Sequence, residues 1–200
     1  MEQSDVLWLK SFEQNLLRNR QLSFSRGGFL SYVAEGSPKM FQFILHSVSV
    51  SGGLRFFADV RRFREEGEAA AGFHFPLTRE RFTFEGQISK IKSQEDIEAA
   101  WANLSPAERS AFASAAPGAP VDVQTLADKF NAQPIEKISE NFAIFELAPK
   151  AVDHLVQKMP EVVADARNPV FESEFKPYKT EKRYIFSLDA GLWKVKQVNP

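Results

Sequence analysis

The sequence predicts a mainly β, α+β fold in which a small antiparallel barrel carries a helix at its N-terminus and a helical insertion in its middle. Short stretches of alternating apolar and polar residues recur along the chain, and most are joined by short links rich in glycine and proline. Near residue 93 the hydrophobic period becomes that of a helix. With 200 residues and 44% hydrophobic content, the chain can bury one full core, so we expect a single domain, residues 1–200.

The N-terminal helix is predicted over about residues 4–19. Ser4 or Asp5 can cap it, because a short polar side chain can accept a hydrogen bond from the first free N–H groups. Leu9, Phe12 and Leu16 then follow at spacings of three and four, which places them on one apolar face.

Five strands are expected next, at residues 28–34, 41–48, 54–59, 71–75 and 81–91. The links at residues 35–38 and 51–53 contain Gly36, Gly52 and Gly53. Such short links predict antiparallel hairpins.

A helical excursion is predicted over about residues 94–131. Ser93 can cap a helix that runs through Trp101, and Ser105 and Glu108 form a capping box around Pro106, which marks a second helix. A third, short helix is expected at residues 122–130.

The C-terminal part of the chain returns to strands at residues 141–147, 183–188 and 192–198, the last two joined as a hairpin. Between them, Val152 and Leu155 lie on one face of residues 149–158. Residues 160–182 combine mixed charge with prolines and show no clean period, so an irregular loop is expected there.

Composition excludes several classes of function. The 25 basic and 26 acidic residues nearly cancel, which disfavours binding to nucleic acid or to an anionic membrane. The absence of cysteine excludes disulfides, thiol nucleophiles and cysteine-based metal sites. Glu2, Asp5 and Glu13 stand where a leader would be apolar or basic, so we expect a soluble protein with no leader, in the cytoplasm or an organelle interior such as the mitochondrial matrix.

The histidines and tryptophans carry no catalytic pattern. His46, His74 and His154 have no metal-ligand spacing, so no metal is expected, and structural or surface roles are favoured for them. The tryptophans are expected to be core or interface anchors. The sequence also lacks the nucleophile elbow, the P-loop and the Rossmann glycine pattern.

Several motifs together resemble one known family. They are Gly36-x-Pro38, residues 56–61, Phe75-Pro76-Leu77-Thr78-Arg79-Glu80-x-Phe82, Trp101-x-x-Leu104-Ser105 with Arg109 and Phe112, Pro117-Gly118, residues 142–147 with Pro149, residues 152–155, and Asn199-Pro200. In this order they resemble the pyridoxamine 5'-phosphate oxidase-like family of FMN-binding split barrels. The resemblance covers residues 15–200 and is carried most specifically by the Phe-Pro-x-Thr-Arg-Glu-x-Phe signature.

This resemblance implies a six-stranded antiparallel split barrel that forms a homodimer. It also implies one FMN at each side of the dimer interface, with contacts from both subunits. Members of the family are typically oxidoreductases or flavin carriers, and the flavin performs the redox chemistry.

The resemblance places the phosphate-binding positions in two segments. An Arg-Thr pair of the family falls on Phe41 and Gln42, which supply no cation. An Arg-Ser-x-Lys run of the family falls on Arg61, Arg62 and Arg64. These three arginines are therefore the expected phosphate clamp, because a phosphate dianion needs fixed positive charge.

A helix is expected to begin at Val60, so that its first N–H groups would assist the clamp. The competing interpretation is a solvated helix face with Arg64 and Glu68 paired four residues apart. Phe41, Phe43 and Leu45 line one face of the second strand, and Phe41 is expected to close the former phosphate end of the pocket.

Three more residues are expected cofactor contacts on the resemblance, namely Phe57, Ala58 and His74. Phe73 and Phe75, beside His74, are expected to pack in the core. For Thr78, Arg79 and Glu80 of the signature a structural turn role is expected.

Two functions remain open at this stage. One is an FMN-dependent oxidoreductase. The other is a flavin-less, non-catalytic family member that serves as an accessory subunit of a larger complex. Exposed phenylalanines flanked by charges, namely Phe63, Phe171 and Phe175, would suit the second as a contact surface.

Overall fold

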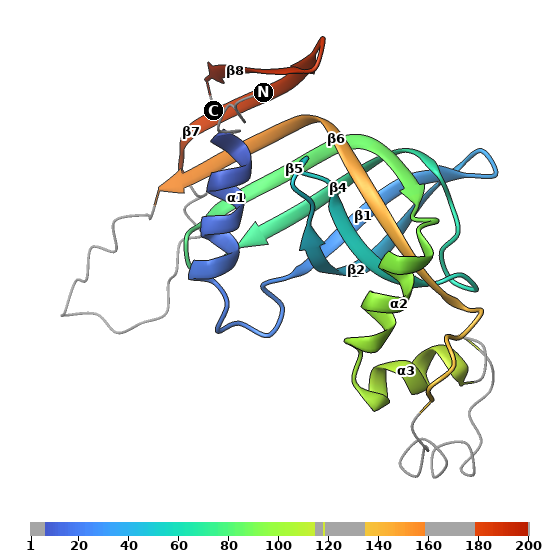
Figure 1. Cartoon of the computed structure of the whole chain (residues 1–200). Coiled ribbons are helices and arrows are strands. Elements are labelled where there is room, and N and C mark those ends of the chain that lie inside the picture. Colours follow the sequence, from blue (N-terminus) through green and yellow to red (C-terminus); the bar gives the residue numbers. More distant parts are fainter. Residues whose placement is uncertain (1–6, 115–117, 119–134, 159–178, 200) are drawn as a thin grey trace. The chain divides into compact units, whose positions relative to one another are not determined.

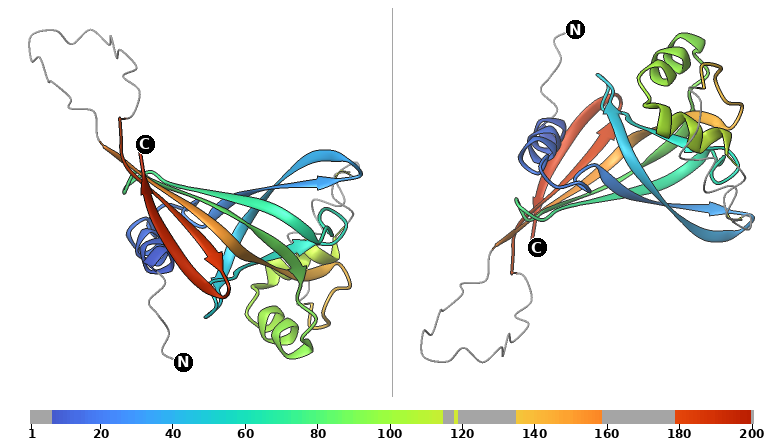
Figure 2. Two further views of the ribbon diagram at one scale, coloured as in Figure 1. Left: turned by 90° about the horizontal axis from the view of Figure 1, so that it is seen from above. Right: turned by 90° about the horizontal axis from the view of Figure 1, so that it is seen from below.

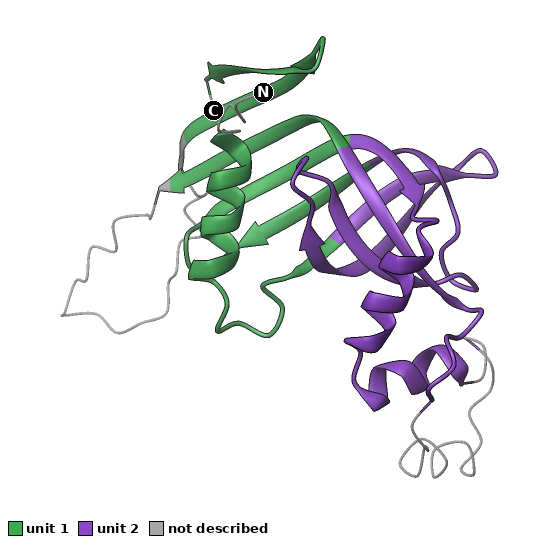
Figure 3. Cartoon of the chain, viewed as in Figure 1, with its two compact units in different colours: residues 1–28, 70–85, 149–200 green, residues 29–69, 86–148 purple. Residues whose placement is uncertain are grey.

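The structure is a computed structural model that describes residues 7–114, 118, 135–158 and 179–199. The chain divides into two compact units, shown in Figure 3. Unit 1 comprises residues 1–28, 70–85 and 149–200, and unit 2 comprises residues 29–69 and 86–148. The predicted short helix at residues 122–130 and most of the predicted loop at residues 160–182 lie outside the described residues.

Eight strands of the described chain form one sheet (Figure 1). They are β1 (Gly27–Ala34), β2 (Ser37–Val48), β3 (Leu54–Asp59), β4 (Gly67–Phe75), β5 (Glu80–Lys90), β6 (Phe142–Lys158), β7 (Lys179–Asp189) and β8 (Leu192–Val198). Their order is β3-β2-β1-β4-β5-β6-β7-β8, and a further pairing of β3 with β6 closes six of them into a ring. The predicted split barrel is confirmed.

Two hairpins turn through pairs of residues with positive φ. Glu35 and Gly36, between β1 and β2, have φ of 53° and 73°, and Ala190 and Gly191 have φ of 48° and 80°. Two successive positive φ angles give a turn whose twist matches that of the flanking strands. The second turn joins β7 and β8, which lie side by side in both views of Figure 2.

In unit 2, β3 and β6 pair antiparallel, with Phe56 opposite Phe145. Along β3 the side chains alternate between buried and half-buried, as expected of a strand with two different faces. The first half of β6 is buried on both faces, which explains its nearly continuous apolar sequence, residues 142–147.

The two helices of unit 2 are α2 (Gln94–Ala102) and α3 (Pro106–Ala113). Ser93 caps α2 by accepting a hydrogen bond from the backbone N–H of Asp96. Ser105 and Glu108 form the predicted capping box of α3, with Pro106 in its first turn. Both predicted helices are confirmed.

An apolar cluster joins these helices to β6. Trp101 packs edge-on against Phe142 with ring centroids 5.2 Å apart, and Phe112 lies 5.0 Å from the same ring. Arg109 donates hydrogen bonds to the carbonyl oxygens of Trp101 (3.0 Å) and Ala102 (2.8 Å), at the C-terminal end of α2. The helix pair is therefore fixed by both packing and a cation at a helix C-terminus.

In unit 1, α1 (Leu7–Arg18) buries a face one residue away from the predicted one. Trp8 and Phe12 are fully buried, whereas Leu9 and Leu16 are only half-buried. Phe12 makes edge-on contacts with four phenylalanine rings of β4 and β5, namely Phe73, Phe75, Phe82 and Phe84. Asn15 and Asn19 continue the buried stripe, at 2% and 0% exposure.

These asparagines anchor α1 to the signature turn between β4 and β5. Asn19 accepts a hydrogen bond from the N–H of Leu77 (3.0 Å) and donates one to the hydroxyl of Thr78 (3.2 Å). The hydroxyl of Thr78 donates to the side-chain oxygen of Asn15. Since a buried polar group costs free energy unless it is hydrogen-bonded, this pairing is what allows a polar helix face to be buried.

Glu80 extends the same network to β6. Its carboxylate accepts a hydrogen bond from the Asn15 amide (2.9 Å) and lies 2.6 Å from Nε2 of His154, which is 6% exposed. The ring of Phe82 stacks on His154 with centroids 4.1 Å apart. Burial alone would raise the pKa of Glu80, but the hydrogen bonds from His154 and Asn15 outweigh it, so the pKa lies below its usual value.

Two segment predictions need correction. The strand expected to end at residue 147 continues through Lys158, and β7 begins at Lys179, inside the predicted loop. The second half of β6 pairs with β7, with Val152 opposite Phe186. The sequence of this half of β6 does not show the alternation of apolar and polar residues expected of a strand, because the polar His154 occupies a buried position. Glu80 is its hydrogen-bond partner there.

Replacing Glu80 by Gln keeps the shape of the side chain but removes the charge that His154 contacts. At neutral pH we expect the free energy of unfolding to fall by about 2 kcal/mol, the size of a hydrogen bond to a charged group. Glu85→Gln changes an exposed glutamate of the same strand and should alter it by less than about 0.5 kcal/mol. Urea unfolding measures both variants.

The lowered pKa of Glu80 gives this prediction a pH dependence. The stabilisation is fully present above the pKa of Glu80 in the unfolded chain, about 4.3, and is lost as the pH falls through the lower pKa of the folded state. The difference between wild type and E80Q should therefore shrink below about pH 4. An undiminished difference in strongly acidic solution would contradict the assignment.

Candidate functional site

The candidate site of unit 2 is the segment after β3, which carries Arg61, Arg62 and Arg64. The helix expected from Val60 is wrong, because Asp59 organises a turn here instead. The carbonyl oxygen of Asp59 accepts hydrogen bonds from the N–H groups of Arg62 (2.8 Å) and Phe63 (3.0 Å), and its carboxylate accepts one from the N–H of Arg61 (2.9 Å). No helix N-terminus is therefore available to an anion at this point.

The competing interpretation of this segment, a solvated helix face, is wrong for the same reason. Glu68 lies on β4, and its carboxylate accepts a hydrogen bond from Gln87 rather than pairing with Arg64 across a helical turn. Phe63, which we expected to be exposed, is 1% exposed and packs against Phe145. Phe63 is therefore not available to the expected contact surface of an accessory subunit. The other two residues of that surface, Phe171 and Phe175, lie outside the described residues.

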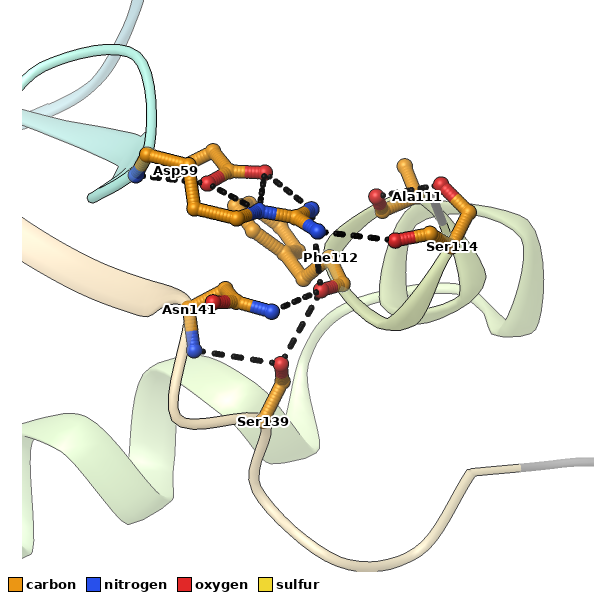
Figure 4. A network of polar contacts seen from close by, with 7 residues as sticks. Asp59, Ala111, Phe112, Ser114, Ser139 and Asn141 are labelled. Atoms are coloured by element: carbon orange, nitrogen blue, oxygen red, sulfur yellow. Dashed lines mark hydrogen bonds and ion pairs between the residues drawn. The ribbon is translucent and has the colours of Figure 1, made fainter. Parts of the chain in front are cut away.

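Arg61 is engaged with protein groups through each of its side-chain nitrogens. Nε and Nη2 donate to the carboxylate of Asp59, at 2.9 Å and 2.6 Å. Nη1 donates to the carbonyl oxygen of Ser114 (2.9 Å), and Nη2 also reaches that of Phe112 (3.4 Å). These hydrogen bonds connect Asp59 with the end of α3, and Figure 4 shows the network that they form.

The carbonyl oxygens at the end of α3 need such donors, because the last turn of a helix has no partner for them within the helix. The oxygen of Phe112 also accepts hydrogen bonds from Ser139 Oγ and Asn141 Nδ2, both at 3.0 Å (Figure 4). A cation is favourable here because the C-terminal end of a helix is the negative end of its dipole. Arg61 thus fixes α3 to the end of β3.

The carboxylate of Asp59 is held in its charged form. Burial would raise its pKa, but hydrogen bonds from the side chain and backbone of Arg61, together with the positive charges of Arg61 and Arg62, lower the pKa below its usual value. At neutral pH the carboxylate is therefore charged and forms an ion pair with the Arg61 guanidinium.

Arg62 and Arg64 have different surroundings. Both are exposed, and neither forms an ion pair within the described part of the chain. Cζ of Arg62 lies 6.0 Å from the centroid of the Phe41 ring, a cation–π contact. Phe41 is half-buried and stacks on Phe63, with ring centroids 4.9 Å apart and planes at 24°.

Of the remaining expected site residues, Ala58 and Phe57 are engaged in packing within unit 2. Ala58 is 3% exposed and lies in the core. Phe57 points to the opposite face of β3, where it packs against His46, with centroids 4.2 Å apart, and Phe142 (5.2 Å). His74 is exposed on β4, in unit 1.

The described residues contain no group of three or more acidic, histidine or cysteine side chains that could hold a metal ion. None of the described helices has the length and hydropathy needed to cross a membrane.

Comparison with known proteins gave structural relatives only, since no family model and no curated protein matches the chain. A pyridoxamine 5'-phosphate oxidase-related, FMN-binding protein of Nostoc punctiforme is 26% identical, with a TM-score of 0.75 over 96% of this chain and 97% of that one. PhzG of Burkholderia lata, solved in complex with tetrahydrophenazine-1-carboxylic acid, is 16% identical, with a TM-score of 0.70 over 98% and 92%. The second likeness shows the fold alone.

The six-stranded ring, the signature turn between β4 and β5, and the likeness to the Nostoc protein over nearly the whole chain agree with one another. They also agree with the resemblance seen in the sequence. The chain therefore has the split-barrel fold of these proteins, and the likeness to the Nostoc protein supports the resemblance to the pyridoxamine 5'-phosphate oxidase-like family.

Proposed function

We propose that this protein binds FMN and acts as a flavin-dependent oxidoreductase. The observation that carries the proposal is the similarity to the Nostoc protein, which is described as FMN-binding and is matched over 96% of this chain. When bound, FMN supplies the redox chemistry, so the protein itself has to hold and orient the flavin and limit its contact with water.

The turn after β3 fits one end of this ligand. A phosphate dianion needs cations that are not already neutralised, and Arg62 and Arg64 are exposed and form no ion pair within the described residues. Arg61 orders the turn through Asp59. The side chains of Phe57 and Ala58 are engaged in packing, so we assign them to holding β3 in place.

Purified protein should take up FMN and show the visible absorption of a bound flavin. Because the proposed phosphate contacts are exposed, raising the salt concentration should weaken the affinity. Fluorescence titration of FMN with the protein at low and high salt measures both effects. A colourless protein that leaves the fluorescence of added FMN unchanged at low salt would contradict the proposal.

We also propose that the protein is a homodimer. The outer face of β1 and β2, in unit 2, exposes four large apolar side chains, namely Phe29 (52%), Val33 (67%), Met40 (70%) and Ile44 (72%). Ser31 and Gln42, between them, are uncharged. A monomer gains nothing from exposing such a patch, and two neutral copies of it can meet about a two-fold axis without opposing like charges.

Ile44→Glu should shift the protein from dimer to monomer, because it would bury a charge without a partner in the centre of this face. Sedimentation velocity or light scattering after size exclusion gives the mass. Val50→Glu, at an 81% exposed position of the turn after β2, is the control and should leave the dimer intact. A wild-type protein that is monomeric at high concentration would contradict the proposal.

A further inference from the structure

We propose that Arg79, in the signature turn between β4 and β5, anchors a binding site for a small oxyanion, either a phosphate or a carboxylate. The site belongs to unit 1 and does not depend on the proposed binding of FMN. The inference starts from a difference between Arg79 and the two residues beside it.

Thr78 and Glu80, on either side of Arg79, have side-chain partners within the protein. The hydroxyl of Thr78 donates to Asn15, and the carboxylate of Glu80 accepts a hydrogen bond from Asn15 and contacts His154. The guanidinium of Arg79 forms neither an ion pair nor a hydrogen bond with the described residues. The turn and its contact with α1 are therefore held without this side chain.

One nitrogen of the Arg79 guanidinium is buried without an acceptor. Nη1 is sealed from water and has no hydrogen-bond partner in the described part of the chain, although the residue as a whole is half-buried. A buried N–H group without an acceptor costs free energy, and the cost is larger when the group is charged. An oxyanion would neutralise this charge, and two of its oxygens match two N–H groups of a guanidinium.

The backbone holds Arg79 in a conformation that does not favour an arginine. Its φ is 58°, in the left-handed region, where glycine is accommodated with less strain. Its N–H donates to the carbonyl oxygen of Phe75 (2.7 Å), and its own carbonyl oxygen accepts a hydrogen bond from the N–H of Gln157 on β6 (3.0 Å). Backbone strain of this kind is typical of functional positions, because the turn itself gains nothing from the arginine side chain.

The charges around Arg79 favour an anion from outside the protein. Glu80, the acid next to it in sequence, is occupied by the buried network described above. On β6, the strand that bonds to this turn, the acid Asp153 is paired with Arg183 (2.7 Å). Arg81, two residues further along the chain, is exposed and carries the same charge as Arg79. The positive charge of the turn is thus available to an oxyanion.

Thermal unfolding without added flavin tests the site, with inorganic phosphate or acetate compared against chloride at equal ionic strength. At ten times its dissociation constant, the bound anion should raise the midpoint temperature of the wild-type protein by roughly 3–6 °C, and the anion with the larger effect identifies the ligand class. Arg79→Met keeps the length of the side chain without its N–H groups and should lose this rise. Arg81→Met is the matched control and should respond as the wild type does. The general stabilisation of proteins by phosphate is common to all three proteins, so the difference between them measures the site.

The same experiment separates anion binding from a structural role. In chloride, Arg79→Met should unfold at a temperature no lower than that of the wild type, because it removes a buried donor that has no acceptor. A markedly lower midpoint in chloride would show that the guanidinium holds the fold, and would overturn the inference. Equal responses of the wild type and Arg79→Met to both oxyanions would also overturn it. If Arg79→Met does not fold, Arg79→Lys replaces it: this variant keeps the charge but lacks the paired N–H groups, so a response as large as that of the wild type would contradict the site.

Discussion

The carboxylate of Asp59 is the group on which the candidate site depends. It lies at the end of β3 and accepts hydrogen bonds from both the backbone N–H and the guanidinium of Arg61. The chain therefore turns at this point instead of starting a helix. The same arginine then reaches the end of α3. One half-buried carboxylate therefore sets the direction of the turn and, through Arg61, fixes α3, while Arg62 is left exposed without an ion pair among the described residues.

In unit 1, neutral and charged groups together supply hydrogen-bond partners to buried polar side chains. Asn15 and Asn19 are buried on α1, and the signature turn supplies their partners through Thr78, Glu80 and the backbone of Leu77. The family signature thus has a physical role in this chain, since it fixes a helix to a β-turn. Its Phe75 and Phe82 contribute the apolar part of the same contact, around Phe12.

Features set by neighbouring residues could be predicted from the sequence, and features set by distant partners could not. The hairpin at Gly36 and the capping box at Ser105 need only local contacts, and both were predicted. The burial of Asn15 and His154 depends on Glu80, which is 65 and 74 residues away, and it was missed. The spacing of Trp8, Phe12, Asn15 and Asn19, by four, three and four, was the one signal that pointed to the buried face. At the site, the three arginines were identified, but their unequal roles depend on Asp59 and on α3.

The most direct test of the central claim is a crystal structure of the protein with FMN bound. We predict that the phosphate lies within hydrogen-bond distance of the guanidinium of Arg62 or Arg64, with the pair of Asp59 and Arg61 intact. A phosphate bound to an Arg61 that has left Asp59, or one that lies away from this turn, would contradict the account.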